Sequence, residues 1–242
     1  FLVRKVLIWK DFPMNYAYMF FIGGGLLLIA SAGFWSLKEI VPSKMKISGV
    51  KEFFKVLKSE TIENKKLAYF LGFINTQGIA ISFLPFVILY AKEEFNAQSS
   101  DTGMFLIFKV IGIVFVSLLV LLGAKKVRYN WLLYSNVILS VLLAVIALVI
   151  RDISLLKYIF VIGGIVYSLY TMSMNGLLLE ISGTENRSLY TGFAGAGNIL
   201  PAIFPLIGGS IIEHFGYHSF FILFIVIVLT AAFFIFKIDC KK

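Results

Sequence analysis

The chain has 242 residues, of which 60% are hydrophobic and only 14% are charged. A soluble domain is about half apolar and about a quarter charged, so this composition excludes an ordinary soluble protein and indicates an integral membrane protein. The net charge of +9 would favour nucleic acid as the partner of a soluble protein. Here the charged residues lie between apolar segments, so we expect an anionic lipid surface and no nucleic acid.

Seven apolar segments follow one another along the chain. Each is long enough to cross about 30 Å of hydrocarbon at about 1.5 Å per residue. None alternates between polar and apolar residues with a period of two, so we predict an all-α polytopic membrane protein with seven transmembrane helices. The predicted segments lie near residues 14–37, 67–91, 103–124, 131–150, 156–179, 188–212 and 218–237.

The connection between the first two segments, residues 38–66, is the one long polar stretch, and it holds eight lysines. Within it Val50, Phe53, Phe54 and Leu57 recur at the spacing of one helical face, which predicts an amphipathic helix. Two compatible interpretations remain open. The helix lies on the membrane surface, or it is a linker helix that packs on the underside of the bundle.

Lysine and arginine are distributed unequally between the two sides of the predicted bundle. The side of residues 38–66 and the C-terminus holds 15 of them, and the other side holds 6. Because cytoplasmic loops carry an excess of basic residues, residues 38–66 and the C-terminus are expected in the cytoplasm and residue 1 outside. The three basic residues in 1–13 run against this rule.

The long basic loop after the first helix divides the chain into three parts. Residues 1–38 would end one helical half, residues 39–66 would form a cytoplasmic linker, and residues 67–242 would form a second half of six helices. The chain begins with Phe1 instead of Met and shows no signal-peptide pattern. We therefore expect further N-terminal helices of the same protein to precede it.

Four short motifs in the second half occur in a characteristic order. One runs from Gly123 to Asn130 with a basic residue at Arg128, and the others are Glu180–Arg187 followed by Gly192, Pro205–Gly209, and Phe215–Tyr217. Together they resemble the major facilitator superfamily, from its sixth helix to its twelfth. The first motif departs from the family signature at Val127 and Asn130, the second lacks the customary proline, and the third lacks its leading glycine.

The resemblance implies a transporter of six plus six helices, of which this chain holds the C-terminal half. Such a protein is a secondary active transporter that moves a small solute by alternating access in a bacterial plasma (inner) membrane. Coupling to protons or another ion, uniport and charge-neutral exchange all remain open. The resemblance implies no enzymatic activity and no cofactor. The alternative is a seven-helix membrane receptor with its N-terminus outside, which matches the helix count but leaves the long basic loop unexplained.

The resemblance also suggests a cytoplasmic latch. Its candidate residues are Gly123, Arg128, Glu180 and Arg187, because an arginine near a helix end can pair with a carboxylate or with the negative end of a helix dipole. The alternative is that these charges are simply solvated at the membrane surface.

Polar side chains inside a span are costly unless they face a cavity or a partner, so they are the candidates for solute contact. They are Asn75, Gln77, Lys109, Tyr167, Tyr170, Thr171, Asn175 and Asn198. Most of them have an alternative interpretation. It is an interhelical hydrogen bond for the two amides Asn75 and Gln77, and an ammonium reaching the membrane surface for Lys109. It is a helix–helix seam for the small and polar stripe of Gly164, Ser168, Thr171 and Asn175, beside which the two tyrosines lie.

Residues 188–213 are apolar but rich in glycine and proline, which a soluble helix would not tolerate. We predict a transmembrane helix that packs inside the bundle and bends at Pro201 and Pro205, with close contacts at Gly192, Gly208 and Gly209.

A membrane enzyme is a poor fit to this sequence. The only histidines, His214 and His218, lie beside Glu213, and Gly216 is expected to break the helix between them. We therefore predict no metal site and no catalytic residue. The single cysteine, Cys240, excludes a disulfide framework.

Overall fold

The computed structural model describes residues 6, 9, 14–34, 49–123, 129–183 and 187–238. Regular structure in these residues is helical throughout, which confirms the predicted all-α class. The helices are α2 (Met14–Phe34), α3 (Val50–Glu63), α4 (Lys65–Gly78), α5 (Ala80–Phe95), α6 (Ser99–Gly123), α7 (Tyr129–Val149), α8 (Ile153–Ser182), α9 (Arg187–Gly197) and α10 (Ile199–Ile238).

Five stretches of the described residues are long and apolar enough to cross a membrane, and a sixth, shorter helix is apolar. The five are Lys65–Phe95, Ser100–Gly123, Tyr129–Val149, Ile153–Ser182 and Arg187–Ile238, and the shorter one is Ala17–Gly33. The count differs from the seven predicted segments partly because the last two of those join into one run of 52 residues.

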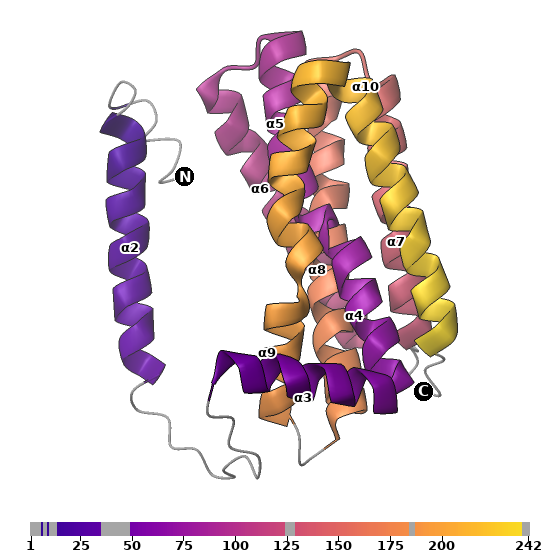
Figure 1. Cartoon of the computed structure of the whole chain (residues 1–242). Coiled ribbons are helices and arrows are strands. Elements are labelled where there is room, and N and C mark those ends of the chain that lie inside the picture. Colours follow the sequence, from indigo (N-terminus) through magenta and orange to yellow (C-terminus); the bar gives the residue numbers. More distant parts are fainter. Residues whose placement is uncertain are drawn as a thin grey trace.

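That run doubles back on itself at Gly216, as its sequence predicts. Gly216 has φ 77° and ψ 173°, a conformation outside the helical region, and the two limbs of α10 stand side by side (Figure 1). A straight helix of this length would measure about 78 Å, far more than a bilayer is thick.

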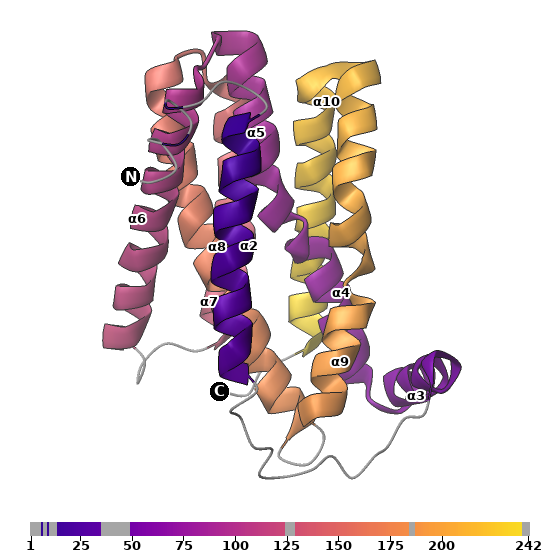
Figure 2. The same ribbon diagram turned by 90° about the vertical axis from the view of Figure 1, so that its left-hand side faces the viewer.

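Helices α4 to α10 form one bundle, and α3 lies across one end of it (Figures 1 and 2). The main packing pairs are α6 with α8, α10 with α4, and α7 with both α8 and α10. Aromatic rings fill the core: the Phe83 ring of α5 lies 4.3 Å from the Phe224 ring in the second limb of α10. Helix α2 stands apart from the bundle (Figure 1).

Helices α6 and α8 approach so closely that only glycine fits between them. A Cβ atom added to Gly112 would run into the backbone carbonyl of Val161, and one added to Gly164 would run into the backbone carbonyl of Lys109. The two contacts are reciprocal, so the backbones of the two helices almost touch there. This α6–α8 seam fixes the position of Lys109 beside α8.

The linker helix α3 packs on the bundle through one face. Phe53, Val56 and Leu57 lie against the hydrophobic core, although no residue of α3 is fully buried. The neighbouring position, Asn64, caps α4: its side-chain oxygen accepts hydrogen bonds from the backbone N–H groups of Lys66 and Leu67. The structure thus contains the packing on the bundle that was one of the two interpretations of this segment.

Candidate functional site

The long Gly- and Pro-rich stretch is interrupted at Asn198, between α9 and α10. Pro201 has no N–H group, so the carbonyl of Gly197 lacks its helical donor. That carbonyl instead accepts a hydrogen bond from Nδ2 of Asn75 at 2.6 Å, and Oδ1 of Asn75 accepts one from the backbone N–H of Leu200 at 2.9 Å. A single amide from α4 therefore replaces the missing bonds.

Of the two predicted bends, only the one at Pro201 coincides with an interruption. It begins three residues before Pro201, at the turn whose carbonyl Pro201 leaves without a donor, whereas Pro205 lies inside α10. The predicted packing glycines also differ from one another. A Cβ atom on Gly208 would lie 2.7 Å from the Phe220 ring and one on Gly192 would lie 3.5 Å from Phe53, whereas Gly209 has open space around it.

A second, weaker interruption faces the first. Helix α4 gives way to α5 at Ile79, whose φ of −60° and ψ of −22° stay helical, so the two helices form one run of 31 residues. A Cβ atom added to Gly78 would lie 2.6 Å from the Pro201 ring, 3.0 Å from the Tyr170 hydroxyl and 3.3 Å from Oδ1 of Asn198. The two interruptions therefore meet beside α8.

Two candidate residues converge at this junction. The Tyr170 hydroxyl is buried and donates a hydrogen bond to the carbonyl of Ile74 at 3.4 Å. Oδ1 of Asn198 is buried and has no hydrogen-bond partner in the described part of the chain. A buried acceptor without a donor is costly, so this oxygen can accept a hydrogen bond from a water or a bound solute.

The open side of α8 carries three more candidates. Tyr167 and Thr171 are half-buried and Asn175 is exposed. The ammonium group of Lys109 lies 4.9 Å from the centre of the Tyr167 ring, a cation–π contact. Lys109 therefore turns its charge toward α8 and not only toward the membrane surface.

The rest of the polar stripe on α8 forms part of the α6–α8 seam. Gly164 contacts the backbone of α6, and Oγ of Ser168 lies 3.0 Å from Oγ of Ser117. The Thr171 hydroxyl bonds back to the carbonyls of Tyr167 and Ser168. The predicted stripe is thus divided: its beginning is a helix–helix seam, and its end is accessible.

Gln77 points away from this region and is fully buried. Its Nε2 donates hydrogen bonds to Oδ1 of Asn136 at 3.0 Å and to Oγ of Ser140 at 2.8 Å, both on α7. This is the interhelical hydrogen bond that was the alternative interpretation of Gln77. Asn136 and Ser140 were not among the predicted residues, although two polar residues four apart in an apolar helix were the signal for them.

The latch residues that the structure describes lie near the end of the bundle crossed by α3. Nε of Arg187, the first residue of α9, donates a hydrogen bond to the carbonyl of Gly183 at 3.0 Å, just after α8 ends. Glu180 is exposed near the same end, and Gly123 is the last residue of α6. Arg128 lies outside the described residues.

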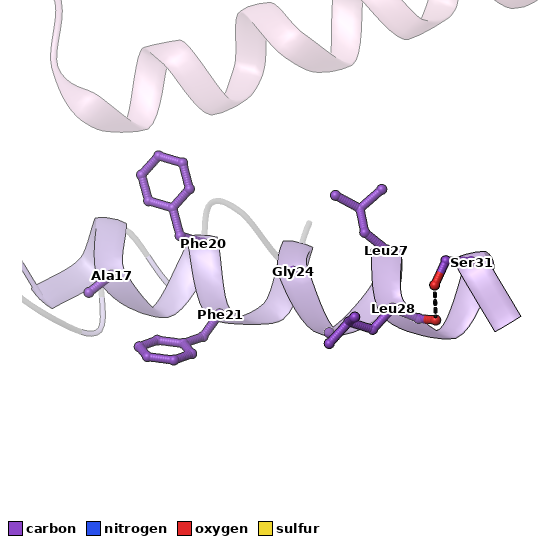
Figure 3. Close-up of a pocket in the computed structure, with 8 residues that line it drawn as sticks. Ala17, Phe20, Phe21, Gly24, Leu27, Leu28 and Ser31 are labelled. Carbon is purple, nitrogen blue, oxygen red and sulfur yellow. Dashed lines mark hydrogen bonds between the residues drawn. The ribbon is translucent and has the colours of Figure 1, made fainter. Parts of the chain in front are cut away.

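Two open pockets lie elsewhere. One, of about 860 Å³, is lined, among the described residues, by side chains of the isolated helix α2. Figure 3 shows that Phe20 and Leu27 point to one side of that helix and Phe21 and Leu28 to the other. A second pocket lies around Ile150 and Arg151, where α7 connects to α8. In the described ranges no three His, Cys, Asp or Glu side chains gather as they would around a metal ion.

Comparison with known proteins places the bundle in one family. Residues 69–239, more than half of the chain, match the family model described as Major Facilitator Superfamily. No curated protein and no solved structure matches the chain significantly. The matched region begins in α4 and includes the whole bundle from there to α10, and it contains both helix interruptions and the polar side of α8. The chain therefore belongs to the Major Facilitator Superfamily.

Proposed function

We propose that the chain is the C-terminal portion of a secondary active transporter that moves a small solute across the membrane by alternating access. Family membership supports a transporter. The observation that carries the mechanism is the helix interruption at Asn198, held together by the Asn75 amide. Discontinuous helices are found where transporters bind solutes and change shape, because their ends can tilt without breaking a continuous hydrogen-bond ladder.

In this proposal the chain crosses the membrane seven times. The crossings are α2, the joined α4 and α5, α6, α7, α8, α9 with the first limb of α10, and its second limb. The apolar side chains of α2, of which Phe20 is 79% exposed and Phe21 is 80% exposed, are available to lipid or to neighbouring helices. Residues 1–38 then end the N-terminal half, 39–66 link the halves, and 67–242 form the C-terminal half.

The proposed solute site lies on the open side of α8 and at the junction beside Asn198. Lys109, Tyr167, Thr171, Asn175 and Asn198 supply a positive charge, an aromatic face, a hydroxyl and two amides. Tyr170 forms the floor of the site, whereas Asn75 and Gln77 hold α4 in place. No carboxylate lies in the middle of any predicted segment, so a proton-coupling acid would belong to the preceding helices.

The proposed latch lies at the cytoplasmic side, where the lysines of 38–66 and the C-terminus place the positive-inside excess. Arg187 holds the end of α8 in one conformation and exchanges this contact for another when the inner side opens. Glu180, Arg128 and Gly123 complete the latch. A bacterial inner membrane is the proposed location.

Alternating access can be tested before the solute is known. A complete protein without other cysteines would carry Thr171→Cys, and a membrane-impermeant thiol reagent would be applied to right-side-out and to inside-out vesicles. We expect labelling from both sides. The control Ser173→Cys, at a fully buried position of α8, should react from neither side.

Labelling of Thr171→Cys from one side alone would reject alternating access and would fit a receptor with a one-sided pocket. Equal labelling of the Ser173→Cys control would mean that the reagent also reaches buried positions when the helices move, and does not report an open path. That result would also reject the assignment of the open side of α8 as a solute path.

A further inference from the structure

Helix α3 is fixed to the beginning of α9 by both apolar and polar contacts. The rings of Phe53 and Phe193 meet edge to face, with centres 5.3 Å apart. The Tyr190 hydroxyl donates a hydrogen bond to Glu60 at 3.0 Å and accepts one from the Asn64 amide at 3.2 Å. The docking face of α3 is therefore occupied, and its orientation on the bundle is set.

The contacts also fix the place of α3 along α9. Tyr190 and Phe193 lie three and six residues after Arg187, where α9 begins, which corresponds to about 5 and about 9 Å along the helix. Helix α3 lies across the bundle in Figure 1 and is seen nearly end-on beside α9 in Figure 2. Amphipathic helices in a membrane interface lie at a similar depth, about 5–10 Å into the boundary between headgroups and acyl chains.

The remaining surface of α3 is divided by charge. At about 100° per residue, the surface outside the docking face divides into two arcs. One arc, which we call the lysine flank, runs from one edge of the docking face to the surface opposite it and holds Val50, Phe54, Ile62, Lys51, Lys55 and Lys58. The other arc, the acidic flank, holds Glu52, Ser59 and Glu63.

The lysine flank combines apolar and cationic groups that are open to the surroundings. Val50 is 74% exposed, Phe54 is 50% exposed and Ile62 is 67% exposed, and all three lysines are exposed. Exposure of these large apolar side chains to water costs free energy, and the neighbouring ammonium groups of the three lysines repel one another. A surface that offers acyl chains and negative headgroups satisfies both groups at once.

We infer that the lysine flank of α3 binds anionic lipid headgroups at the membrane surface, with Phe54 and Ile62 inserted at the acyl boundary. The docked position of α3 at interfacial depth brings this flank to the bilayer, and the segregation of Glu52 and Glu63 to the acidic flank removes the charges that would oppose binding. The inference needs α9 to cross the membrane, but it does not depend on transport.

The test uses the complete protein, without other cysteines, in nanodiscs. One variant, Ile62→Cys, carries a fluorophore on the lysine flank, and the matched variant, Ser59→Cys, carries it on the acidic flank. Nanodiscs contain brominated phosphatidylcholine, which quenches fluorophores at the acyl boundary, with or without phosphatidylglycerol. We expect phosphatidylglycerol to increase quenching at position 62 by at least about twofold and to leave position 59 unchanged.

Three substitutions together, Lys51→Gln, Lys55→Gln and Lys58→Gln, should abolish the response to phosphatidylglycerol at position 62. The pair Glu52→Gln and Glu63→Gln should preserve it. Equal quenching with and without phosphatidylglycerol, or a response that survives the lysine substitutions, would overturn the inference.

Discussion

Helix α8 borders two interfaces that are built in opposite ways. On its α6 side, Gly112 and Gly164 bring two backbones into contact, and nothing can shift without a clash. On its α4 side, two interrupted helices meet at Gly78 and depend on hydrogen bonds from one side chain, Asn75. Close packing is rigid, whereas amide hydrogen bonds can be exchanged for others. The bundle therefore has a stiff side, at α6, and an adjustable side, at α4.

The largest expected effect is a break of the stiff side. In Gly164→Ala the new methyl group would overlap the carbonyl of Lys109, so α6 and α8 must separate. We expect a loss of about 3 kcal/mol in stability, measured as thermal unfolding of the purified complete protein. The control is Gly209→Ala, where nothing lies within 4 Å and better helix propensity should leave stability unchanged or slightly higher. If Gly164→Ala were as stable as the unchanged protein, α6 and α8 would be able to separate at this point with little loss of stability.

The next effect concerns the adjustable side. Asn75→Leu removes the partner of the Gly197 carbonyl and of the Leu200 N–H group, so two backbone groups lose their hydrogen bonds. We expect a loss of about 2 kcal/mol and faster hydrogen exchange around Asn198. Thr76→Val is the matched control, because the Thr76 hydroxyl bonds only to carbonyls of its own helix. If hydrogen exchange around Asn198 were unchanged in Asn75→Leu, the interruption would not depend on the Asn75 amide.

A smaller effect is expected where α9 meets α3. Tyr190→Phe removes the hydrogen bonds to Glu60 and Asn64 but keeps the ring that lies 5.8 Å from Phe193. We expect a loss of about 1 kcal/mol, seen as faster hydrogen exchange in α3 with little change in α6 and α8. Faster hydrogen exchange throughout the bundle would instead mean that the contact between α9 and α3 stabilises the whole bundle, as the α6–α8 seam does.

The smallest effect concerns the buried amides between α4 and α7. Gln77 bonds to Asn136, but Oε1 of Gln77 and Nδ2 of Asn136 have no partner in the described structure. A double-mutant cycle with Gln77→Leu and Asn136→Leu should give a coupling of about 0.6 kcal/mol, the average for such pairs in membranes. A coupling of several times that value would show that a bound water completes the cluster.

The features that were predicted correctly from the sequence depend on residues that are close together in the chain. Apolar length located the helices, and the helix ends follow local chemistry: Asp152 caps α8 by accepting a hydrogen bond from the Ser154 N–H group, and Gly183 ends it with φ 60°. These polar caps lie beyond the apolar part, which is why α8 is longer than the predicted 156–179. The turn at Gly216 was also readable from the sequence alone.

What could not be predicted depends on residues far apart in the sequence. The interruption falls at Asn198 and not at Pro205 because Asn75, 122 residues before Gly197, satisfies the freed carbonyl. Likewise, Gln77 is a candidate for solute contact or for packing until Asn136 and Ser140 are seen beside it. Gly112 was missed because a single glycine in an apolar helix does not reveal which backbone it will touch.

The turn at Gly216 has a consequence for how the protein is made. Its φ of 77° and ψ of 173° belong to a region that is open almost only to glycine, and no long polar loop separates the two limbs. The last two crossings would therefore enter the bilayer together, as a ready-made helical hairpin, and not one after the other. A side chain at this position would act during membrane insertion, so its effect would be seen in how much protein reaches the membrane, before any property of the finished molecule is measured.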